Sequence, residues 1–459
     1  MGRLIVISQR APRPDPSKDA GGLVVALRST LEAEGGLWIG IAGETTQMVG
    51  ETLEWQDAGG LRIGQLTLSH SEHAGQYLGF ANGTLWPVFH NRIDLSRYSS
   101  AEFATYTAVA ERLARLVAQE LRSGDTVWIH DYQMIPVARA LRALGVTAKI
   151  GFFLHIPWPS VDSFHTIPQH RQVIEDMAAY DVIGLQAQRD LRNFSNCAVA
   201  SGVGEWLPNG RFRIAGNAVT LGHFPISIDV EEFAALAQST KGQTPRAYEL
   251  IGVERLDYSK GLPQRFLAFQ RFLEKNEDAH GHVRFLQIAP PSRSKLEAYR
   301  DISDELDRRA GHVNGRFGST DWVPMHYISQ TVPRPDVARL LAEAQVGIVT
   351  PLMDGMNLVA KEFIAAQDED DPGVLVLSQF AGAAEELDAA LIVNPYDVEA
   401  LADAMGRALS MSLDERRERH RHNYERLRSA TIHDWAASFL NVLRPGHGSQ
   451  DPASSPLSG

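Results

Sequence analysis

The chain has 459 residues, 44% of them hydrophobic, which is enough for two or three ordinary domains with proper cores. Its 44 Lys and Arg against 56 Asp and Glu give a net charge of −12, which argues against a general nucleic-acid binder or a partner of anionic membranes. The single cysteine, Cys197, excludes an intramolecular disulfide and a cysteine-based zinc cluster. No apolar run approaches the ~20 residues of a membrane span, so we expect a soluble, cytoplasmic protein.

Apolar runs of strand length alternate with longer helical patterns in the first half of the chain. These runs are almost continuously apolar, which is typical of parallel strands covered by helices on both faces. Strands are predicted over 4–8, 37–41, 126–130, 149–156, 181–186 and 218–226, and helices over 23–33, 101–122 and 135–144.

The same pattern restarts after a polar segment, 229–247. Strands are predicted again over 248–256, 283–290, 346–351, 373–379 and 390–395. We therefore predict an α/β fold of two Rossmann-like, doubly wound parallel-sheet domains, 1–230 and 231–430, facing a central cleft. Ligands are expected at the carboxyl ends of the strands.

Three predictions concern the end of the chain. Residues 414–428 form a charge-dense helix, interpreted as a solvated face that leaves both His420 and His422 in water. The amphipathic helix over 431–445 is expected to pack back on the first domain. The Gly/Ser/Pro-rich tail, 446–459, is predicted to be disordered.

The stretch 346–362 combines a buried strand, a turn at Asp354-Gly355 and a helix that begins near Asn357. A fresh helix N-terminus beside a tight turn is an anion site, because backbone N–H groups and the positive end of the helix dipole point at it. Glu362 lies one helical turn further, spaced to accept hydrogen bonds from a diol. This arrangement favours a nucleotide sugar.

Basic residues follow several predicted strands directly. Arg255 and Lys260 lie after the strand that ends near residue 254, and they are candidates to hold a diphosphate. Arg293 and Arg10 follow two other strands in the same way, which predicts a positive cleft inside an acidic protein. The alternative is that the loop of Arg255 and Lys260 carries only surface ion pairs with Glu254 and Asp257.

Gly21 and Gly22 precede a predicted helix, which would let backbone N–H groups approach a ligand closely. The pair alternatively marks only a turn. Asp131 and His155 end two strands, and polar groups at such positions belong to the cleft more often than to the core.

Trp38, Tyr77 and Trp86 are placed near strand or loop ends of the first domain. Sugar faces stack on such rings, but each ring is alternatively a core residue. Familiar signatures such as G-x-x-x-x-G-K-[ST], H-E-x-x-H and G-x-S-x-G are missing. The acidic run 368–371 resembles a metal-binding D-x-D, but it lies in a helix-to-strand loop at the wrong end of the sheet, so no metal is expected.

Longer motifs carry a family resemblance from residue 3 to about 443. They include AGGLVVAL, LWPVFH, WIHDYQMIP, GFFLHIPWP, VERLDYSKGLPQRFLAF and PLMDGMNLVAKEF. With these motifs the chain resembles the trehalose-6-phosphate synthases, retaining glycosyltransferases of the GT-B fold. The resemblance implies transfer of glucose from UDP-glucose, or another nucleoside diphosphate glucose, to glucose 6-phosphate without a metal, with α,α-trehalose 6-phosphate as the product.

The resemblance also assigns residues one by one. The acceptor positions are Arg10, Tyr77, Trp86, Asp131 and Arg293, with Trp86 and Ile156 shaping the anomeric preference. The donor positions are Gly21, Gly22, His155, Arg255, Lys260, Val332, Asp354, Met356, Asn357, Leu358, Val359, Ala360, Lys361 and Glu362. Asp131, His155, Arg255, Lys260 and Asp354 are the implied catalytic residues.

Two residues depart from the family pattern: Gln9 replaces a common Asn, and Met353 replaces a common Arg. The family also implies a homo-oligomer, a dimer or a tetramer. Two alternatives use the same scaffold: a glucosylglycerol-phosphate synthase and a non-catalytic sugar-phosphate sensor. The first should lose part of the acceptor set and the second part of the donor set, yet both sets are present.

Overall fold

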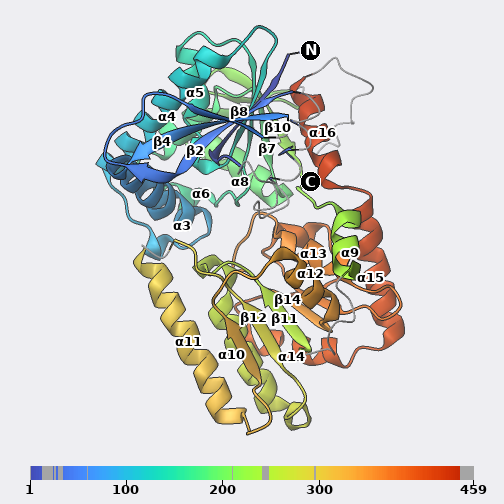
Figure 1. Ribbon diagram of the computed structural model, residues 1–459. Helices are drawn as coiled ribbons and strands as arrows, with labels where there is room; N and C mark the ends of the chain where they lie inside the picture. Colours follow the sequence, from blue (N-terminus) through green and yellow to red (C-terminus); the bar gives the residue numbers. More distant parts are fainter. Residues whose placement is uncertain are drawn as a thin grey trace. The chain divides into compact units, whose positions relative to one another are not determined.

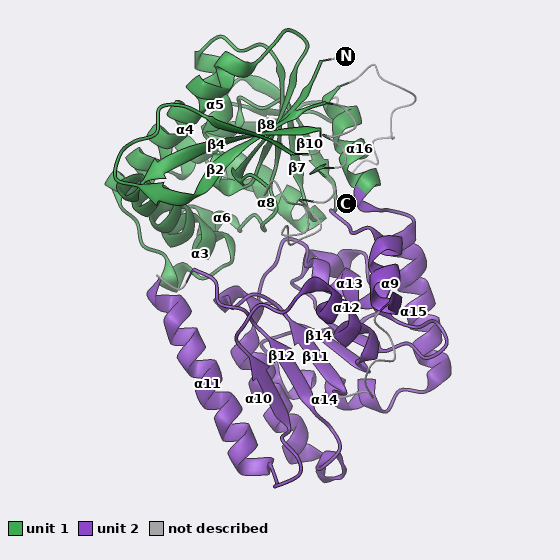
Figure 2. Ribbon diagram, in the orientation of Figure 1, with its two compact units in different colours: residues 1–225, 433–459 green, residues 226–432 purple. Residues whose placement is uncertain are grey.

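The computed structural model describes residues 2–12, 24, 27–28, 31, 35–58, 60–208, 210–239, 248–293 and 296–444 (Figure 1). It divides into two compact units, coloured separately in Figure 2: residues 1–225 with 433–459, and residues 226–432. Part of the polar segment between the predicted domains, 240–247, and the predicted disordered tail lie outside the described residues.

In the described ranges, the sheet of unit 1 has ten strands in the order β3-β4-β2-β1-β5-β6-β7-β10-β9-β8. Pairing is parallel from β4 to β10 and antiparallel at both edges, where β3 pairs with β4 and β9 with β8 and β10. The strands are β1 Leu4–Arg10, β2 Leu37–Thr46, β3 Glu54–Ala58, β4 Leu61–Ser69, β5 Thr126–His130, β6 Lys149–Phe153, β7 Val182–Leu185, β8 Gly204–Trp206, β9 Phe212–Ile214 and β10 Asn217–His223.

Helices connect these strands. The longest is α4, Ser100–Glu120, which begins at the N-cap Ser99. A π-helix, η2 (His73–Leu85), runs into α3 (Trp86–Phe89) without a break in the helical backbone. The others are α2 His70–Glu72, η3 Ile93–Leu95, η4 Tyr132–Met134, α5 Val137–Ala143, α6 Val161–Phe164, α7 His170–Met177 and α8 Gln188–Ala200.

The last helix among the described residues, α16 (Ile432–Leu443), packs on the sheet of unit 1. Phe439 stacks on Trp128 of β5, with ring centroids 4.6 Å apart. Gly151 of β6 and Gly184 of β7 leave room for the Phe439 ring, because a Cβ there would lie 2.6 Å and 2.9 Å from it. The Phe439 ring therefore fits against the sheet only because these two positions are glycines.

The sheet of unit 2 has six strands in the order β13-β12-β11-β14-β15-β16, and every pair is parallel. Its strands are β11 Leu250–Val253, β12 Phe285–Ile288, β13 Met325–Ile328, β14 Val346–Val349, β15 Val374–Ser378 and β16 Leu391–Val393. Its helices are α9 Val230–Ser239, η5 Tyr258–Lys260, α10 Leu262–Lys275, η6 Glu277–Ala279, α11 Glu297–Phe317, α12 Arg334–Glu343, α13 Leu358–Ala366, η7 Gly382–Glu385, α14 Val398–Leu409 and α15 Leu413–Arg428.

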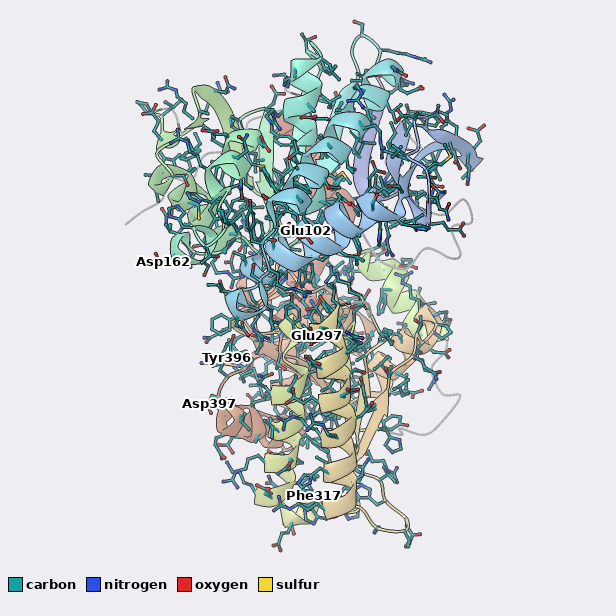
Figure 3. The ribbon with its side chains drawn as sticks, turned by 90° about the vertical axis from the view of Figure 1, so that its left-hand side faces the viewer. Glu102, Asp162, Glu297, Phe317, Tyr396 and Asp397 are labelled. Atoms are coloured by element: carbon teal, nitrogen blue, oxygen red, sulfur yellow. The ribbon has the colours of Figure 1, made fainter. Side chains whose placement is uncertain are left out.

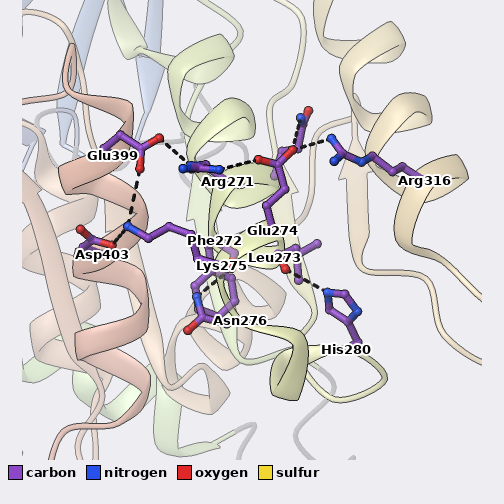
Figure 4. A network of polar contacts seen from close by, with 11 residues as sticks. Arg271, Phe272, Leu273, Glu274, Lys275, Asn276, His280, Arg316, Glu399 and Asp403 are labelled. Atoms are coloured by element: carbon purple, nitrogen blue, oxygen red, sulfur yellow. Dashed lines mark hydrogen bonds and ion pairs between the residues drawn. The ribbon is translucent and has the colours of Figure 1, made fainter.

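Ion pairs join neighbouring helices of unit 2. Figure 3 marks the two ends of α11 at Glu297 and Phe317. Figure 4 shows the neighbouring network, in which Arg271 of α10 binds Glu399 of α14 at 2.5 Å and Glu274 at 3.1 Å. Exposed ion pairs of this kind are screened by solvent, so the network adds little stability and keeps this face polar.

The predicted fold class is confirmed, since both units are α/β with mostly parallel sheets. The interpretation of 414–428 as a wholly solvated helix is wrong. His420 is only 5% exposed, and its Nε2 lies 3.0 Å from the Ile364 carbonyl of α13. His422 is exposed as predicted and pairs with Asp388 at 2.8 Å.

The acidic run 368–371 is held by arginines of α15. Arg416 pairs with Asp371 at 2.8 Å, and Arg417 donates to the Asp370 carbonyl at 2.9 Å. Across the described residues, we find no group of three or more His, Cys, Asp or Glu side chains arranged to hold a metal ion. Nor does any helix in the described ranges have the length and apolar character to cross a membrane.

Candidate active site

Buried side chains hold the turn that carries Arg10 in place. The pairing of β1 with β2 shifts register between Ser8 and Arg10, which forms a bulge at the end of β1. Ser8 Oγ donates to the Arg10 carbonyl at 2.7 Å and accepts a hydrogen bond from Trp38 Nε1 at 2.8 Å. Trp38 is therefore a buried support for the turn, in line with its core alternative, while the Arg10 side chain is exposed.

Gln9, the bulge residue, contacts the helix that carries Tyr77. Gln76 Nε2 donates to Gln9 Oε1 at 3.0 Å, and Gln76 itself is buried. Gln76 directly precedes Tyr77 in η2. The pair therefore ties the turn of Arg10 to the helix of Tyr77, and the departure from the family's Asn has a structural partner.

A buried chain of hydrogen bonds holds η2 in place. Tyr106 OH donates to the Tyr132 carbonyl at 2.6 Å, and Tyr132 OH donates to Asn82 Oδ1 at 2.8 Å. Asn82 Nδ2 in turn donates to the Tyr77 carbonyl at 2.7 Å. The ring of Trp86, at the start of α3, lies 5.7 Å from the Tyr132 ring. Tyr77 and Trp86 are thus locked to the segment that follows Asp131.

Asp131 adopts a backbone conformation that glycine normally occupies, with φ 75° and ψ 162°. Such a conformation costs about 1–3 kcal/mol and is typical of functional sites. Its N–H donates to the Phe153 carbonyl at 2.8 Å, and its Oδ1 accepts from the His155 N–H at 3.3 Å. These contacts join the ends of β5 and β6. Ile156, the next residue, is buried.

The imidazole of His155 is neutral. Burial lowers its pKa to about 3, so it carries no proton charge near neutral pH. It can therefore donate or accept hydrogen bonds to an uncharged hydroxyl but cannot neutralise a phosphate.

In unit 2 the loop after β11 is anchored by two buried ion pairs. Arg265 binds Glu254 at 2.7 Å, and Arg293 binds Asp257 at 2.9 Å. Glu254 and Asp257 are 5% and 1% exposed. The alternative of surface ion pairs with Arg255 and Lys260 is therefore wrong, since these carboxylates are buried and take other arginines as partners.

The two arginines are held by further contacts. Arg265 also donates to Thr350 Oγ1 at 3.1 Å and to Gln287 Oε1 at 2.9 Å. Arg293 has φ 47° and donates to Tyr299 OH at 2.6 Å, while Tyr299 OH donates to Asp257 at 2.7 Å. The loop therefore rests on a network of buried polar contacts, although Glu254 Oε2 and Ser259 Oγ have no partner among the described residues, and the Arg255 side chain is exposed.

Lys260 and Asp354 form an ion pair at the start of α13. Asn357 Nδ2 donates to the same Asp354 oxygen, Oδ2, at 3.1 Å, and Asn357 Oδ1 accepts from the Ala360 N–H at 3.3 Å. Asn357 has φ 82° and is the N-cap. The strand, the turn and the helix start predicted over 346–362 are thus present, with a cation beside them.

Further along α13, the side chains of Lys361 and Glu362 have different environments. Lys361 is fully buried, and its Nζ donates to the Ile226 carbonyl at 2.8 Å and binds Glu386 at 2.6 Å. It therefore offers a ligand only its backbone. Burial raises the pKa of Glu362 to about 7, although nearby Arg334 lowers it.

Other predicted site residues stand as follows. Met356 is buried, and Val332, Leu358 and Val359 are half-buried. Gly21 and Gly22 lie outside the described residues. The sequence interpretation missed Gln76, Asn82, His130 and Arg265, although Arg265 interrupts the apolar pattern of α10 and is fully buried.

Comparisons with known proteins agree on one group. The model of glycosyltransferase family 20 matches residues 8–445. A curated trehalose-6-phosphate synthase of Sinorhizobium fredii is 44% identical over 459 aligned residues, which cover 96% of this chain and 98% of that protein.

Solved structures are equally similar. An α,α-trehalose-phosphate synthase (UDP-forming) from Burkholderia xenovorans in complex with glucose-6-phosphate is 42% identical, with a TM-score of 0.92 and coverage of 96% of this chain and 100% of that one. A trehalose-6-phosphate structure from E. coli bound with UDP-2-fluoro glucose is 40% identical, with a TM-score of 0.92 and coverage of 96% and 99%.

Proposed function

Since the chain belongs to glycosyltransferase family 20, we propose that it moves glucose from UDP-glucose to glucose 6-phosphate and releases UDP. The activity is that of a UDP-forming α,α-trehalose-phosphate synthase, which retains the configuration of the transferred glucose. The observation that supports this most is the cluster of Lys260, Asp354 and Asn357 at the N-terminus of α13.

The donor takes Arg255, Lys260 and the first turn of α13, residues 358–362, in which Leu358 and Val359 offer their N–H groups to the diphosphate because no helical carbonyl accepts them. Leaving-group charge builds up as the glycosidic bond breaks, and fixed cations and helix N–H groups stabilise it without reorganising. The ion pair keeps the Lys260 ammonium beside the turn before the donor arrives. Val332 and Met356 line the donor by backbone and apolar contact, and Glu362 accepts hydrogen bonds from the ribose diol.

The transferred glucose takes Asp354 and His155. Both offer hydrogen-bonding groups to sugar hydroxyls, Asp354 as an acceptor and His155 as a neutral ring. In this proposal a departing phosphate oxygen takes the proton of the attacking hydroxyl on the same face of the sugar, which accounts for retention. Gly21 and Gly22 contribute backbone N–H groups to the donor phosphates.

The acceptor takes Arg10 and Arg293 on its 6-phosphate, with Tyr77 and Asp131 on the sugar. Arginine suits this role because its planar fork matches phosphate oxygens. Trp86 and Ile156 shape the anomeric preference by packing. We also propose that the protein works in the cytoplasm as a homo-oligomer, a dimer or a tetramer, which light scattering would test.

The test is mass detection of products. UDP-, ADP- and GDP-glucose are each offered with glucose 6-phosphate and with glycerol 3-phosphate. Trehalose 6-phosphate from UDP-glucose is the expected product. Product only with glycerol 3-phosphate would instead identify a glucosylglycerol-phosphate synthase, and saturable binding of glucose 6-phosphate without any product would identify a sensor.

A further inference from the structure

The ring of His155 contacts a second histidine, His130, which is the last residue of β5. His130 Nδ1 lies 3.1 Å from His155 Nε2, and the two rings stack with centroids 5.3 Å apart. His130 is 1% exposed. The proposed function uses His155 and gives His130 no part, so the contact needs its own explanation.

Both rings are neutral near pH 7. Burial lowers the pKa of His155 to about 3. Burial, helped by the neighbouring His155, lowers the pKa of His130 well below its ordinary value. Each neutral imidazole carries one N–H and one bare nitrogen. A single proton therefore lies between Nδ1 of His130 and Nε2 of His155, and it belongs to one ring or the other.

The two arrangements differ in what each ring presents elsewhere. If His155 donates from Nε2, the proton of His130 sits on its own Nε2, and His155 presents a bare Nδ1. If His130 donates from Nδ1, its Nε2 is bare, and His155 carries its proton on Nδ1.

The surroundings of His130 distinguish these arrangements. Its Nε2 is buried and has no hydrogen-bond partner among the described residues. The centroids of the Trp128 and Trp435 rings lie 4.6 Å and 6.4 Å from the centroid of the His130 ring, and their indole N–H groups are equally buried and without a partner in the described ranges. Buried N–H groups without an acceptor are rarer than buried acceptors without a donor. If Nε2 of His130 carries no proton, this cluster holds only two buried N–H groups without an acceptor, those of Trp128 and Trp435, and not a third.

We infer that His130 donates its Nδ1 proton to Nε2 of His155 and so fixes His155 as the tautomer that carries its proton on Nδ1. His155 then presents a permanent N–H donor on the side of the ring away from His130. Its backbone is held at the same time, because its N–H donates to Asp131 at 3.3 Å. His130 is a positioning residue, and only the identity of the recipient, a sugar hydroxyl oxygen, rests on the proposed function.

The tautomer is measured directly by ¹⁵N–¹H long-range NMR correlation on the full chain, labelled in histidine and free of ligand at pH 7. The signals of His155 are identified by their loss in His155→Gln. The inference predicts a pyrrole-type shift for His155 Nδ1 and a pyridine-type shift for Nε2. The reversed pattern, or averaged shifts, would overturn it whether or not the chain is a transferase.

Kinetics supply the second test, in which His130→Asn and His130→Phe are compared. The Asn amide replaces the Nδ1–H donor, whereas Phe keeps the ring volume and removes the donor. Loss of one neutral hydrogen bond predicts a kcat about tenfold lower in His130→Phe, with His130→Asn restored to within about threefold of the parent. An equal loss of kcat in the two variants, when both unfold at the same temperature as the parent protein, would contradict the inference. A parent that makes no product would refute the proposed function and leave the NMR result standing.

Discussion

Glu362 gives the site a pH dependence that belongs to one residue. Its pKa is raised to about 7 by burial, and in our proposal only the carboxylate accepts both hydrogen bonds from the ribose diol. Donor KM should therefore fall about eightfold to tenfold between pH 6 and pH 8, since the ionised fraction rises by that factor. Initial rates against UDP-glucose concentration across this range measure it.

The matched control is Glu362→Gln, which keeps the shape of the side chain and cannot ionise. Its donor KM should be raised and flat with pH. The phosphate of the substrate glucose 6-phosphate titrates near pH 6 whichever protein is assayed. Any pH dependence of the acceptor KM should therefore persist in the variant. If the donor KM of the parent and of the variant depended on pH in the same way, Glu362 would not bind the ribose diol.

The contact between Gln9 and Gln76 joins the neighbours of Arg10 and Tyr77, which we propose to bind the acceptor. Gln9→Asn shortens the side chain by one methylene and breaks the 3.0 Å contact. A lost hydrogen bond of this kind is worth about 0.5–1.5 kcal/mol, so KM for glucose 6-phosphate should rise about threefold to tenfold, with donor KM unchanged. Gln56→Asn, at an exposed position of β3, is the control. Equal effects on both substrates would contradict the assignment.

At the residue scale, the sequence indicates which side chains could be functional but not which residues they contact in the fold. Arg10, Asp131 and His155 could be singled out as site candidates because polar residues at the ends of apolar strands have few structural reasons to be there. Gln76 and His130 were not, because their contacts join residues 67 and 25 positions apart. No local pattern specifies such contacts.

The turn at the end of β1 depends on its neighbour β2. A Cβ at Gly40 would lie 2.5 Å from the Ala11 nitrogen and 3.0 Å from the Arg10 carbonyl carbon. Gly40→Ala should push the backbone of Arg10 outward, raise KM for glucose 6-phosphate about tenfold or more, and destabilise the protein by about 1–3 kcal/mol. Steady-state kinetics and urea unfolding measure the two effects.

Gly43→Ala lies in the same strand and is the control. A Cβ there would meet no described atom within 4 Å. It should leave both quantities near the parent values. If Gly40→Ala behaved like Gly43→Ala, the acceptor arginine would not depend on this close approach.

Elements were predictable where their pattern was simple. The buried parallel strands are short apolar runs, and the sequence shows them clearly. β3 and β4 were missed because polar and apolar residues mix along them. The π-helix η2 was missed because its residues follow no α-helical period, and its place is set by the buried Tyr106, Tyr132 and Asn82 contacts.

For the whole molecule, the buried histidine pair predicts sensitivity to acid. Burial lowers the folded-state pKa of His130, so below about pH 6.5 the unfolded chain binds this proton more readily than the folded chain does. His130 therefore stabilises the fold above pH 6.5, and this stability is lost as pH falls. The loss grows as the pH falls further below 6.5, for as long as the folded protein resists protonation of His130.

The comparison of the parent with His130→Asn isolates this contribution. Buried carboxyls such as Asp176, whose pKa is raised to about 6, change stability in the opposite direction. They do so equally in both proteins. Urea unfolding at pH 7.5 and at pH 5 should show a fall in the free energy of unfolding that is smaller in His130→Asn than in the parent. Identical falls would show that His130 is protonated in the folded protein.

Unit 1 also depends on the far end of the chain, because α16 fills the space above Gly151 and Gly184. A chain that stops at residue 430 should leave the Trp128 ring uncovered and be recovered mostly as aggregate. A chain that stops at residue 444 keeps α16 and should stay in solution. Equal recovery of the two after expression would show that α16 is dispensable for folding.

This arrangement has a consequence for synthesis on the ribosome. The first 225 residues are completed before the 207 residues of unit 2, 226–432, are translated. At about 5–20 residues per second this leaves the nascent sheet without its covering helix for roughly 10 to 40 seconds. Unit 2 is in effect an insertion within unit 1. We expect chaperones that hold nascent chains to bind this protein during that interval, over the aromatic surface that α16 later covers.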